Sequence, residues 1–178
     1  MENRKIKLSK QLLKQALLEL LEEKKLHQIS IRELCAKADL NRSTFYAHYE
    51  DINYLIQDLE NDIIKDMPFM DYRKNKSEKD ILEYAKFIEK NYQKMIPLVQ
   101  NGLLISRIVE NSVEFFLKEG TKTEKEIEQF TLLTHFCVSG SLQSLYYYSS
   151  QCKHLTTTEI SQIIYKMYIE AENIRKKV

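Results

Sequence analysis

Apolar residues recur every three or four positions along nearly the whole chain, and few residues interrupt that spacing. The 178 residues include 3 glycines and 2 prolines, far fewer than a protein of this length usually contains. No segment shows the sustained two-residue alternation that is typical of a half-buried strand. The sequence therefore predicts an all-α protein, and its length allows a small helical head joined to a larger helical body.

Several of the expected helices begin at a hydroxyl residue that is followed three positions later by an acid. The hydroxyl oxygen accepts a hydrogen bond from an otherwise unpaired backbone amide, and the positive end of the helix favours the carboxylate. The four starts of this kind are Ser30 with Glu33, Ser77 with Asp80, Thr123 with Glu126, and Thr156 with Glu159. These pairs predict where helices begin independently of their apolar faces.

The N-terminal third of the chain divides into four helices with short connections. We expect these helices at about residues 9–24, 30–38, 42–49 and 52–67, with Pro68 ending the fourth. Asn41 and Asp51 are expected to cap the third and fourth helices. The segment 68–76 then joins a head, residues 1–66, to a body, residues 67–178.

The body is predicted to hold four or five further helices that form a bundle. One is expected to end at Pro97 and the next near Gly120. A long helix is expected from Thr123 to about Gln151, and the last helix begins at Thr156.

Two short helices joined by a three-residue turn, with a longer helix packed across them, are typical of a helix-turn-helix DNA-binding unit. In that arrangement the second short helix enters the major groove, and Phe45 would pack inward. The side chains expected on DNA bases or phosphates are Arg42, Ser43, Thr44, Tyr46, His48 and Tyr49, with Lys10 and Arg32 from the preceding helices. Many small helical proteins contain such turns, so this geometry alone does not decide the function.

The same segment resembles a known protein family. Residues 9–66, through the run ISIRELCAKADLNRSTFYAHYEDINYLI, are similar to the N-terminal domain of the tetracycline-repressor (TetR) family of bacterial transcriptional regulators. The shared features are the helix start, the alanine before the turn, and the T-[FL]-Y-x-[HY]-[FY] pattern of the recognition helix. The resemblance implies that Thr44 reads bases and Tyr46 holds a phosphate, with Arg42, Ser43 and His48 beside them. The rest of the chain resembles the family only in its length, its helical pattern and its long penultimate helix.

The sequence departs from the family pattern at two positions. Asp39 stands where members often have glycine, although a left-handed turn tolerates aspartate. Ile52 stands where many members have a phosphate-binding lysine at the start of the fourth helix. The backbone amides there could still bind a phosphate, but Glu50 and Asp51 would oppose an anion. These departures bear on the affinity for DNA.

The net charge of +1 conceals an uneven distribution. Residues 1–49 hold ten basic and six acidic residues, whereas residues 50–66 hold one basic and six acidic residues. A basic set on the first helix comprises Arg4, Lys5, Lys7, Lys10 and Lys14. It fits an arm on phosphate or a solvated face, and a helix lying on a membrane is a third reading. The apolar side of that helix is better explained by packing within a three-helix head than by a membrane.

The long helix that begins at Thr123 has no charged residue after Glu128, although a helix with one solvated side usually needs charge there. We therefore expect a second subunit to cover part of it, together with the last helix. The expected dimer interface comprises Phe136, Ser139, Gly140, Gln143, Tyr147, Ile160, Ile164, Met167 and Ala171. By family analogy some aromatic residues of the body would line a small-molecule pocket, and the candidates are Tyr84, Phe87, Tyr92 and Phe116.

Metal and disulfide sites have little support in the sequence. Cys35, Cys137 and Cys152 include no CxxC pair and are expected to be reduced thiols of a cytoplasmic protein. His135 lies two residues from Cys137, and His154 lies two residues from Cys152, so each pair would point to different faces of a helix. We expect no metal site and no cofactor.

Enzymatic and membrane functions also have little support. The sequence holds no glycine-rich phosphate loop and no pattern of an activated nucleophile, so we expect no catalytic residues. The uncharged stretch 129–152 is about half polar, which suits a buried helix better than a membrane span.

These features predict a cytoplasmic, homodimeric transcription factor that acts as a repressor on an inverted-repeat operator in double-stranded DNA. The resemblance implies a small-molecule effector as a further partner. Two alternatives remain open. One is an activator, or a regulator controlled by a protein partner, that senses no small molecule. The other is a helical enzyme whose catalytic groups the sequence does not reveal.

Overall fold

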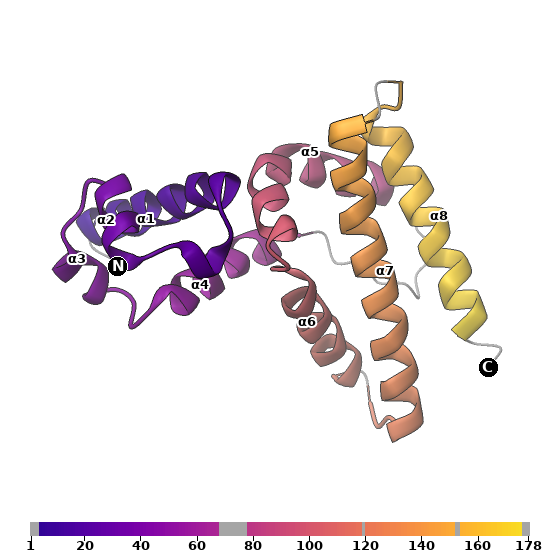
Figure 1. Ribbon diagram of the computed structural model, residues 1–178. Coiled ribbons are helices and arrows are strands. Elements are labelled where there is room, and N and C mark those ends of the chain that lie inside the picture. Colours follow the sequence, from indigo (N-terminus) through magenta and orange to yellow (C-terminus); the bar gives the residue numbers. More distant parts are fainter. Residues whose placement is uncertain (1–3, 68–77, 119, 152–153, 176–178) are drawn as a thin grey trace. The chain divides into compact units, whose positions relative to one another are not determined.

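The computed structural model describes residues 4–67, 78–118, 120–151 and 154–175, and every regular element in these ranges is a helix (Figure 1). The all-α prediction is confirmed. In chain order the elements are α1 (Arg4–Glu23), the 3-10 helix η1 (Leu26–Gln28), α2 (Ile31–Lys37), α3 (Arg42–Tyr46), α4 (Ile52–Lys65), α5 (Glu78–Gln100), α6 (Ile105–Leu117), α7 (Glu124–Gln151) and α8 (Thr157–Arg175).

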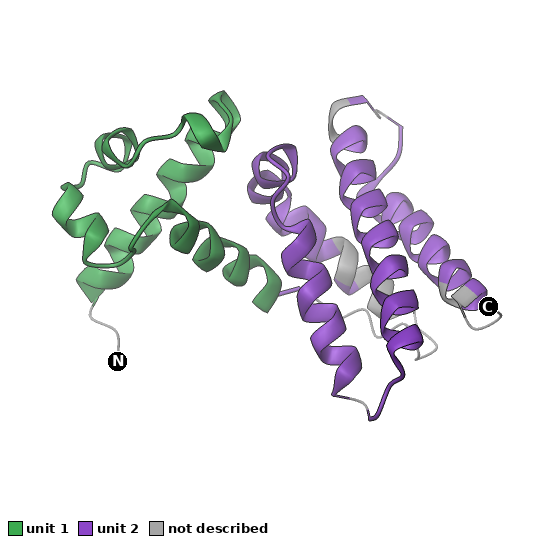
Figure 2. Cartoon of the chain, turned by 60° about the horizontal axis from the view of Figure 1, so that its bottom comes forward, with its two compact units in different colours: residues 1–65 green, residues 66–178 purple. Residues whose placement is uncertain are grey.

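The chain divides into two compact units, a head unit of Met1–Lys65 and a body unit of Asp66–Val178 (Figure 2). In the head unit α1 packs against α2 and α4, and α2 packs against α3. Its centre is formed by side chains with no exposed surface, one or two from each helix: Leu13, Leu17, Leu34, Phe45 and Leu55. Complete burial of such side chains contributes about 1.5–3 kcal/mol each, so the short α3 is held by Phe45 rather than by its own length.

The body unit is a bundle in which α7 lies between α6 and α8, and α8 also packs on α5 (Figure 1). Each of these helices contributes an apolar stripe to the interior, including Leu98, Ile108, Leu142 and Ile164. At the α6–α7 end the rings of Phe116 and Phe130 stack with centroids 4.2 Å apart.

Three of the four predicted helix starts lie among the described residues, and all three are present. Ser30 accepts a hydrogen bond from the backbone amide of Glu33 at 3.2 Å. At Thr123 and at Thr156 the pairing is reciprocal, because the acid three residues later also accepts from the backbone amide of the threonine at 2.8 Å. The fourth start, Ser77 with Asp80, and the joining segment 68–76 fall outside the described residues.

Three predicted boundaries were wrong. The first helix was expected from about residue 9, but α1 begins at Arg4. Pro97 was expected to end a helix, but α5 continues through it to Gln100. Pro97 is fully buried together with its neighbour Leu98, and burial of this last turn outweighs the one backbone hydrogen bond that proline removes. The helix expected over 42–49 ends at Tyr46, and its last three residues instead lead towards α4.

The turn between α2 and α3 is a Schellman motif with aspartate at the left-handed position. Asp39 has φ = 51°, and its amide donates to the carbonyl of Ala36 at 3.3 Å. The amide of Leu40 donates to the carbonyl of Cys35 at 2.9 Å. This pair of bonds closes the end of α2 and sets the start of α3.

Replacing Asp39 with glycine is expected to stabilise the head unit by about 0.5–1 kcal/mol, because glycine adopts positive φ without a Cβ penalty. Urea unfolding followed by circular dichroism measures the change. Asp39→Ala is the matched control and is expected to destabilise, since alanine lacks both the glycine conformation and the local hydrogen-bonding side chain. Equal stabilities of the parent and the two variants would contradict the claim that Asp39 is strained in this turn.

Candidate nucleic-acid interface

The outer face of α3 comprises Arg42, Ser43, Thr44 and Tyr46. Thr44 is half-buried, whereas the other three are exposed, with Tyr46 at 51%. The buried Phe45 supports Tyr46 from inside, because their rings meet edge to face at a centroid distance of 5.5 Å. The Arg42 guanidinium carbon lies 6.0 Å from the centre of the Tyr46 ring. α3 therefore presents a preorganised group of one cation, two hydroxyls and one phenol.

His48 lies just after α3, and a hydrogen bond to Ser9 connects this end of α3 to α1. Its Nε2 is 2.7 Å from Oγ of Ser9, which is itself buried. The Ser9 hydroxyl also lies within hydrogen-bonding distance of the carbonyls of Lys5 and Ile6 within α1. The tautomer of His48 sets whether Nε2 donates to Ser9 or accepts from it. This bond gives His48 a positioning role for α3, and a contact between His48 and DNA stays a prediction.

Tyr49 does not offer its hydroxyl to phosphate as the sequence suggested. The side chain is buried, and its hydroxyl donates to Oδ2 of Asp58 in α4 at 2.7 Å. The ring packs against Phe45 at a centroid distance of 5.8 Å. A hydroxyl that already donates to a carboxylate inside the head is not available to an anion, so we assign Tyr49 to the core.

Part of the basic set on α1 is neutralised by acids of α4. Lys14 Nζ lies 3.1 Å from Asp58 and 2.6 Å from Asp62, and Lys10 Nζ lies 3.7 Å from Asp58. Lys10 also lies over the Tyr49 ring, at 5.7 Å from its centre. The two oppositely charged segments of the sequence thus fold against each other, and Lys10 is a weaker candidate for a DNA contact than expected.

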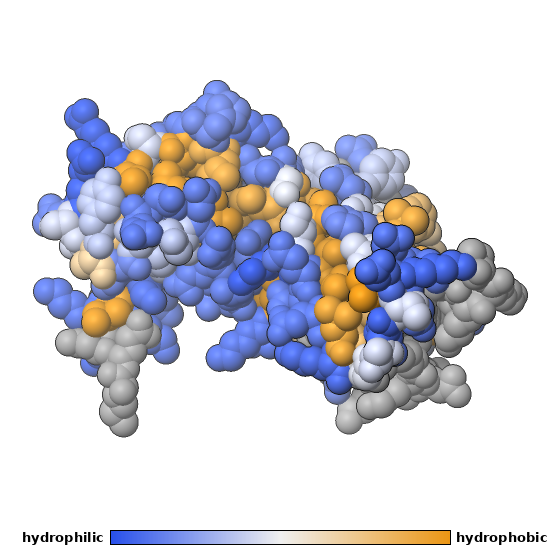
Figure 3. Space-filling view, turned by 90° about the horizontal axis from the view of Figure 1, so that it is seen from below, coloured by the Kyte–Doolittle hydropathy of each residue, from blue (hydrophilic) through white to orange (hydrophobic). Residues whose placement is uncertain are grey.

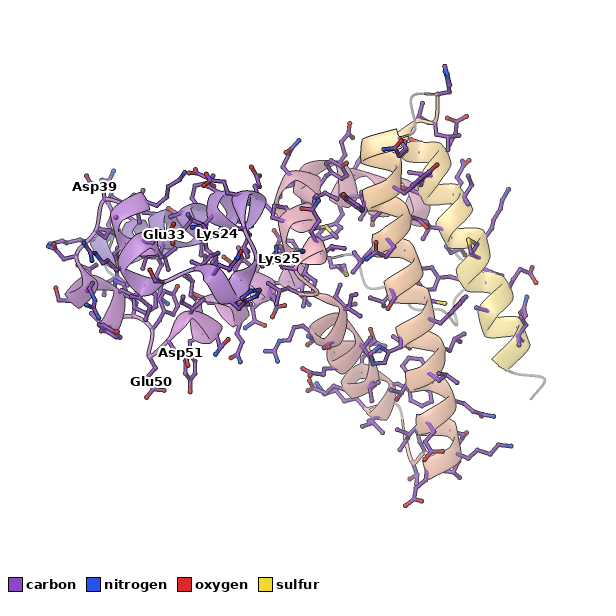
Figure 4. All side chains as sticks on the ribbon, in the orientation of Figure 1. Lys24, Lys25, Glu33, Asp39, Glu50 and Asp51 are labelled. Atoms are coloured by element: carbon purple, nitrogen blue, oxygen red, sulfur yellow. The ribbon has the colours of Figure 1, made fainter. Side chains whose placement is uncertain are left out.

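Further ion pairs join α1 to α2. Lys37 pairs with Glu19 and Glu23, and Lys24 pairs with Glu33 beside it (Figure 4). The basic residues of the head for which the described part of the structure contains no ion pair are Arg4, Lys7, Arg32, Arg42 and Lys65, and all five are exposed. Lys65 ends α4, so the four cations of α1, α2 and α3 remain for phosphate.

The start of α4 is acidic, and its amides are already occupied. Oδ1 of Asp51 accepts from the backbone amides of Asn53 at 2.7 Å and Tyr54 at 3.2 Å, as the predicted cap requires. Glu50 lies beside Asp51 at the same end of α4 (Figure 4). A hydrogen bond to Glu50 and its charge raise the pKa of Tyr54. This helix end is therefore unsuited to an anion, in contrast to the ordinary helix N-terminus.

Asp58 makes the head unit sensitive to acid. Burial alone would raise the pKa of this carboxyl, but hydrogen bonds from Tyr49 and Lys14 and the charges of Lys14 and Lys10 lower it overall. A carboxyl whose pKa is lower in the folded state stabilises the fold above its unfolded-state pKa, and that stability is lost as the pH falls through the folded-state pKa.

We expect Asp58→Asn to reduce the loss of unfolding free energy on going from about pH 5 to pH 2, because asparagine accepts from Tyr49 without titrating. Urea unfolding at a series of pH values measures this slope. Asp66→Asn, at an exposed carboxyl of the body, is the control. An acid slope unchanged by Asp58→Asn would remove this residue from the acid response.

The predicted dimer interface requires a correction on α8. Ile160, Ile164 and Ala171 are buried inside their own body unit, so they cannot form the surface that meets a second chain. The exposed apolar residues of α7 and α8 form what we term the outer body face: Leu132, Phe136 and Tyr147 of α7, with Ile163, Met167 and Ile174 of α8. Gly140 and Gln143 are also exposed on α7, and Ser139 is half-buried.

The residues Leu132, Ile163 and Ile174 were missed because two apolar stripes run along these helices, and spacing alone does not tell which one is buried. On α8 the members of each stripe recur four or seven residues apart, as in a packed helix pair. Figure 3 shows hydrophobic residues gathered in bands on the surface, with hydrophilic residues beside them.

The four candidate ligand-binding residues have different surroundings. Phe87 and Phe116 are buried. The ring of Phe116 already stacks on Phe130, and Lys122 Nζ lies 4.8 Å from its centre. Tyr92 is half-buried with an enclosed hydroxyl. The side chain of Tyr84 lies outside the described residues.

Within the described ranges, no three His, Cys, Asp or Glu side chains gather as metal ligands would. None of the helices in those ranges is both long and apolar enough to cross a bilayer. Cys35 and Cys137 are buried free thiols, and Cys152 lies outside the described residues.

Comparisons with known proteins identify the fold. No protein-family model matches the sequence, and no curated protein matches it. Among solved structures, the chain is similar to one described as a TetR transcriptional regulator from Streptococcus agalactiae, with a TM-score of 0.62 and 19% sequence identity. The match covers 93% of this chain and 96% of that one, so both units take part. The chain has the fold of a TetR regulator.

Proposed function

We propose that the protein is a sequence-specific DNA-binding transcriptional regulator, acting as a repressor on an inverted-repeat operator. The observation that carries the proposal is the outer face of α3, where Arg42, Ser43 and Tyr46 stand exposed on a short helix fixed from behind by Phe45. A helix this short gains little stability by itself. A surface of this kind fits the major groove, which admits a helix and displays base edges.

The side chains divide into base-reading and phosphate-binding groups. Arg42 and Ser43 have the donors and acceptors that read base edges, and Thr44 adds a hydroxyl and a methyl group. Tyr46 donates its hydroxyl to a phosphate, while Arg4, Lys7 and Arg32 supply charge along the backbone. Since the start of α4 holds Glu50 and Asp51, phosphate binding relies on α1, α2 and α3.

The outer body face supports a homodimer. Its members are large apolar side chains on two packed helices, with Phe136 at 69%, Leu132 at 74% and Met167 at 59% exposed. So many large apolar side chains left exposed on two packed helices are uncommon on a monomer, and two copies would form a four-helix seam about a two-fold axis. The dimer presents two α3 helices to half-sites about one helical turn apart, which requires an inverted repeat.

A repressor must be able to dissociate from its operator when the gene is to be expressed. A small molecule that favours a body conformation with wrongly spaced heads lowers the affinity for DNA, and DNA lowers the affinity for that molecule by the same factor. The body unit, with its interior between α5 and α7, is the place for such a molecule.

Binding to a selected operator is expected to weaken steeply with salt although the net charge is only +1. If each head neutralises about three phosphates with the cations left unpaired, log K falls against log salt with a slope of about −5. Fluorescence anisotropy on a labelled operator measures the slope, and Lys7→Gln is expected to reduce its magnitude by about 2 in the dimer. A slope near −1 would contradict the proposed phosphate contacts.

A further inference from the structure

One carboxylate oxygen of the head unit holds three partners, two from α1 and one from the segment after α3. Oδ2 of Asp58 accepts a hydrogen bond from the Tyr49 hydroxyl at 2.7 Å, and it lies 3.1 Å from Lys14 Nζ and 3.7 Å from Lys10 Nζ. Although burial alone would raise the pKa of Asp58, the hydrogen bonds from Tyr49 and Lys14 lower it overall. The carboxylate is therefore charged at physiological pH and attracts both lysines there.

The two lysines differ in how easily they can leave Asp58. Lys14 Nζ also donates to the backbone carbonyl of Asp58 at 3.2 Å and to Oδ2 of Asp62 at 2.6 Å, so each of its three N–H groups has an oxygen to bond. The Lys14 side chain is 13% exposed, whereas that of Lys10 is 32% exposed. Lys10 lies farthest from the carboxylate, and the other two partners would still satisfy Asp58 without it. Lys10 is therefore the more easily released cation.

Lys10 is one of the residues around a hollow at the end of α3. The hollow has a volume of about 380 Å³. Its lining comprises Lys10, His48, Tyr49, Glu50, Tyr54 and Asp58. The hydrogen bond between Ser9 and His48 holds this part of α1 against the end of α3. A DNA strand that follows the outer face of α3 would therefore pass the hollow, which has room for a phosphate group.

The charges around the hollow oppose a phosphate as long as Lys10 stays with Asp58. Lys10 is the one lysine or arginine of the lining, and the lining also holds the carboxylates of Glu50 and Asp58. Glu50 accepts a hydrogen bond from the Tyr54 hydroxyl, so it has a partner inside the hollow. A phosphate that enters the hollow can be stabilised only if Lys10 turns from Asp58 towards it.

We propose that Lys10 and this hollow form a phosphate site for DNA, and that Asp58 weakens the site by acting as an internal competitor for Lys10. The inference rests on the proposed function, because the phosphate belongs to the DNA that α3 reads. On binding, Lys10 exchanges Asp58 for the phosphate, so each head gains one contact and gives up one ion pair. Asp58 thus lowers the affinity for DNA of any sequence, and discrimination is left to the side chains of α3.

A double-mutant cycle on the full chain tests the competition. Fluorescence anisotropy gives the affinities of the parent, Lys10→Gln, Asp58→Asn and the double variant for a selected operator and for an unrelated duplex of equal length. Asp58→Asn is expected to raise both affinities by the same factor, about tenfold, since an exposed ion pair is weak and lowers the affinity of each of two heads about threefold. Lys10→Gln is expected to lower the affinity about tenfold more in the Asp58→Asn background than in the parent, because Asp58 no longer offsets the phosphate contact.

Asp62→Asn is the matched control, because it removes the same charge one turn further along α4. Asp62 pairs with Lys14, so this variant should raise the affinity only slightly and leave the effect of Lys10→Gln as it is in the parent. Urea unfolding confirms that each variant is folded during the titrations. The proposal is overturned by an Asp58→Asn variant that binds DNA no more tightly than the parent, or by equal effects of Lys10→Gln in the two backgrounds.

A measurement on the parent alone does not depend on whether Asp58→Asn folds. With isotope-labelled lysine, the NMR signal of Lys10 Nζ is expected to shift when either duplex is added, whereas that of Lys14 Nζ should stay. A Lys10 signal that DNA leaves unchanged would contradict the exchange. The preference of the parent for the operator over the unrelated duplex tests the proposed function separately, since the cycle can be measured on the unrelated duplex alone. A parent that binds neither duplex would overturn both.

Discussion

Replacing Tyr46 with phenylalanine is expected to lower the affinity for the operator by at least about 100-fold while leaving the stability of the head unit unchanged. The variant removes one hydroxyl from an exposed side chain whose ring keeps its contact with Phe45. A hydrogen bond to a charged phosphate contributes about 1.5–3 kcal/mol, and a dimer loses two of them. Anisotropy on a labelled operator and urea unfolding measure the two quantities.

Tyr49→Phe is the matched control, because it removes the same atom three residues further along the chain. Its hydroxyl donates to Asp58 inside the head, so we expect a loss of about 1–2 kcal/mol of stability and little loss of operator affinity at a temperature where the head is folded. Thr44→Ala is expected to resemble Tyr46→Phe. If Tyr49→Phe abolished binding and Tyr46→Phe did not, the outer face of α3 would be wrongly assigned.

Replacing Gly140 with arginine is expected to separate the subunits and to abolish operator binding together. Gly140 is exposed and a Cβ built there meets nothing within 4 Å, so the single chain has room for a side chain to begin there. Within a seam formed by the outer body face, two unpaired arginines would cost at least about 4 kcal/mol, equivalent to a 1,000-fold weaker dimer. Sedimentation velocity measures the mass, and circular dichroism checks that α7 is intact.

Ser106→Arg is the control for Gly140→Arg, since it adds the same charge at an exposed position of α6, away from the outer body face. It should remain dimeric and bind the operator. A monomeric parent, or a Gly140→Arg variant that stays dimeric and binds DNA, would place the interface elsewhere.

The fold was predictable because its signals are local. The hydroxyl and acid pairs at Ser30, Thr123 and Thr156 are complete within four residues, and each is formed as the sequence indicates. The left-handed conformation of Asp39 agrees with the resemblance to a family that often has glycine at this position. Pro97 was misjudged because its effect depends on burial by the rest of the bundle, which its neighbours in sequence do not encode.

The roles of the charged and phenolic residues could not be read from the sequence, since they depend on partners from distant segments. The sequence predicts Tyr49 and Lys10 as phosphate contacts. In the structure both contact Asp58, which lies nine residues after Tyr49 on another helix. Some basic residues of the head therefore pair with its own acidic segment, and only the others are available to DNA. Counting charges overestimates how many cations are left for phosphate.

The prediction of interface residues on α8 was wrong for a different reason. A helix with apolar residues on two sides gives two equally regular stripes. The prediction took Met167 from the exposed stripe but Ile160, Ile164 and Ala171 from the one that the body buries. Ile163, Met167 and Ile174 lie on a different side of α8 and remain exposed. The choice between the stripes is made by α5 and α7, which pack against only one side of α8.

The central claim is that α3 reads bases, and selection from a random DNA pool by two variants tests it most directly. The parent should enrich an inverted repeat with half-sites about one helical turn apart. Ser43→Asn should enrich a repeat altered at the same position of both half-sites, because the new amide prefers adenine. Lys7→Gln should enrich the parental repeat with weaker binding throughout, because phosphate contacts carry no sequence information. If Ser43→Asn enriched the parental repeat unchanged, or the parent enriched no sequence at all, the claim would be contradicted.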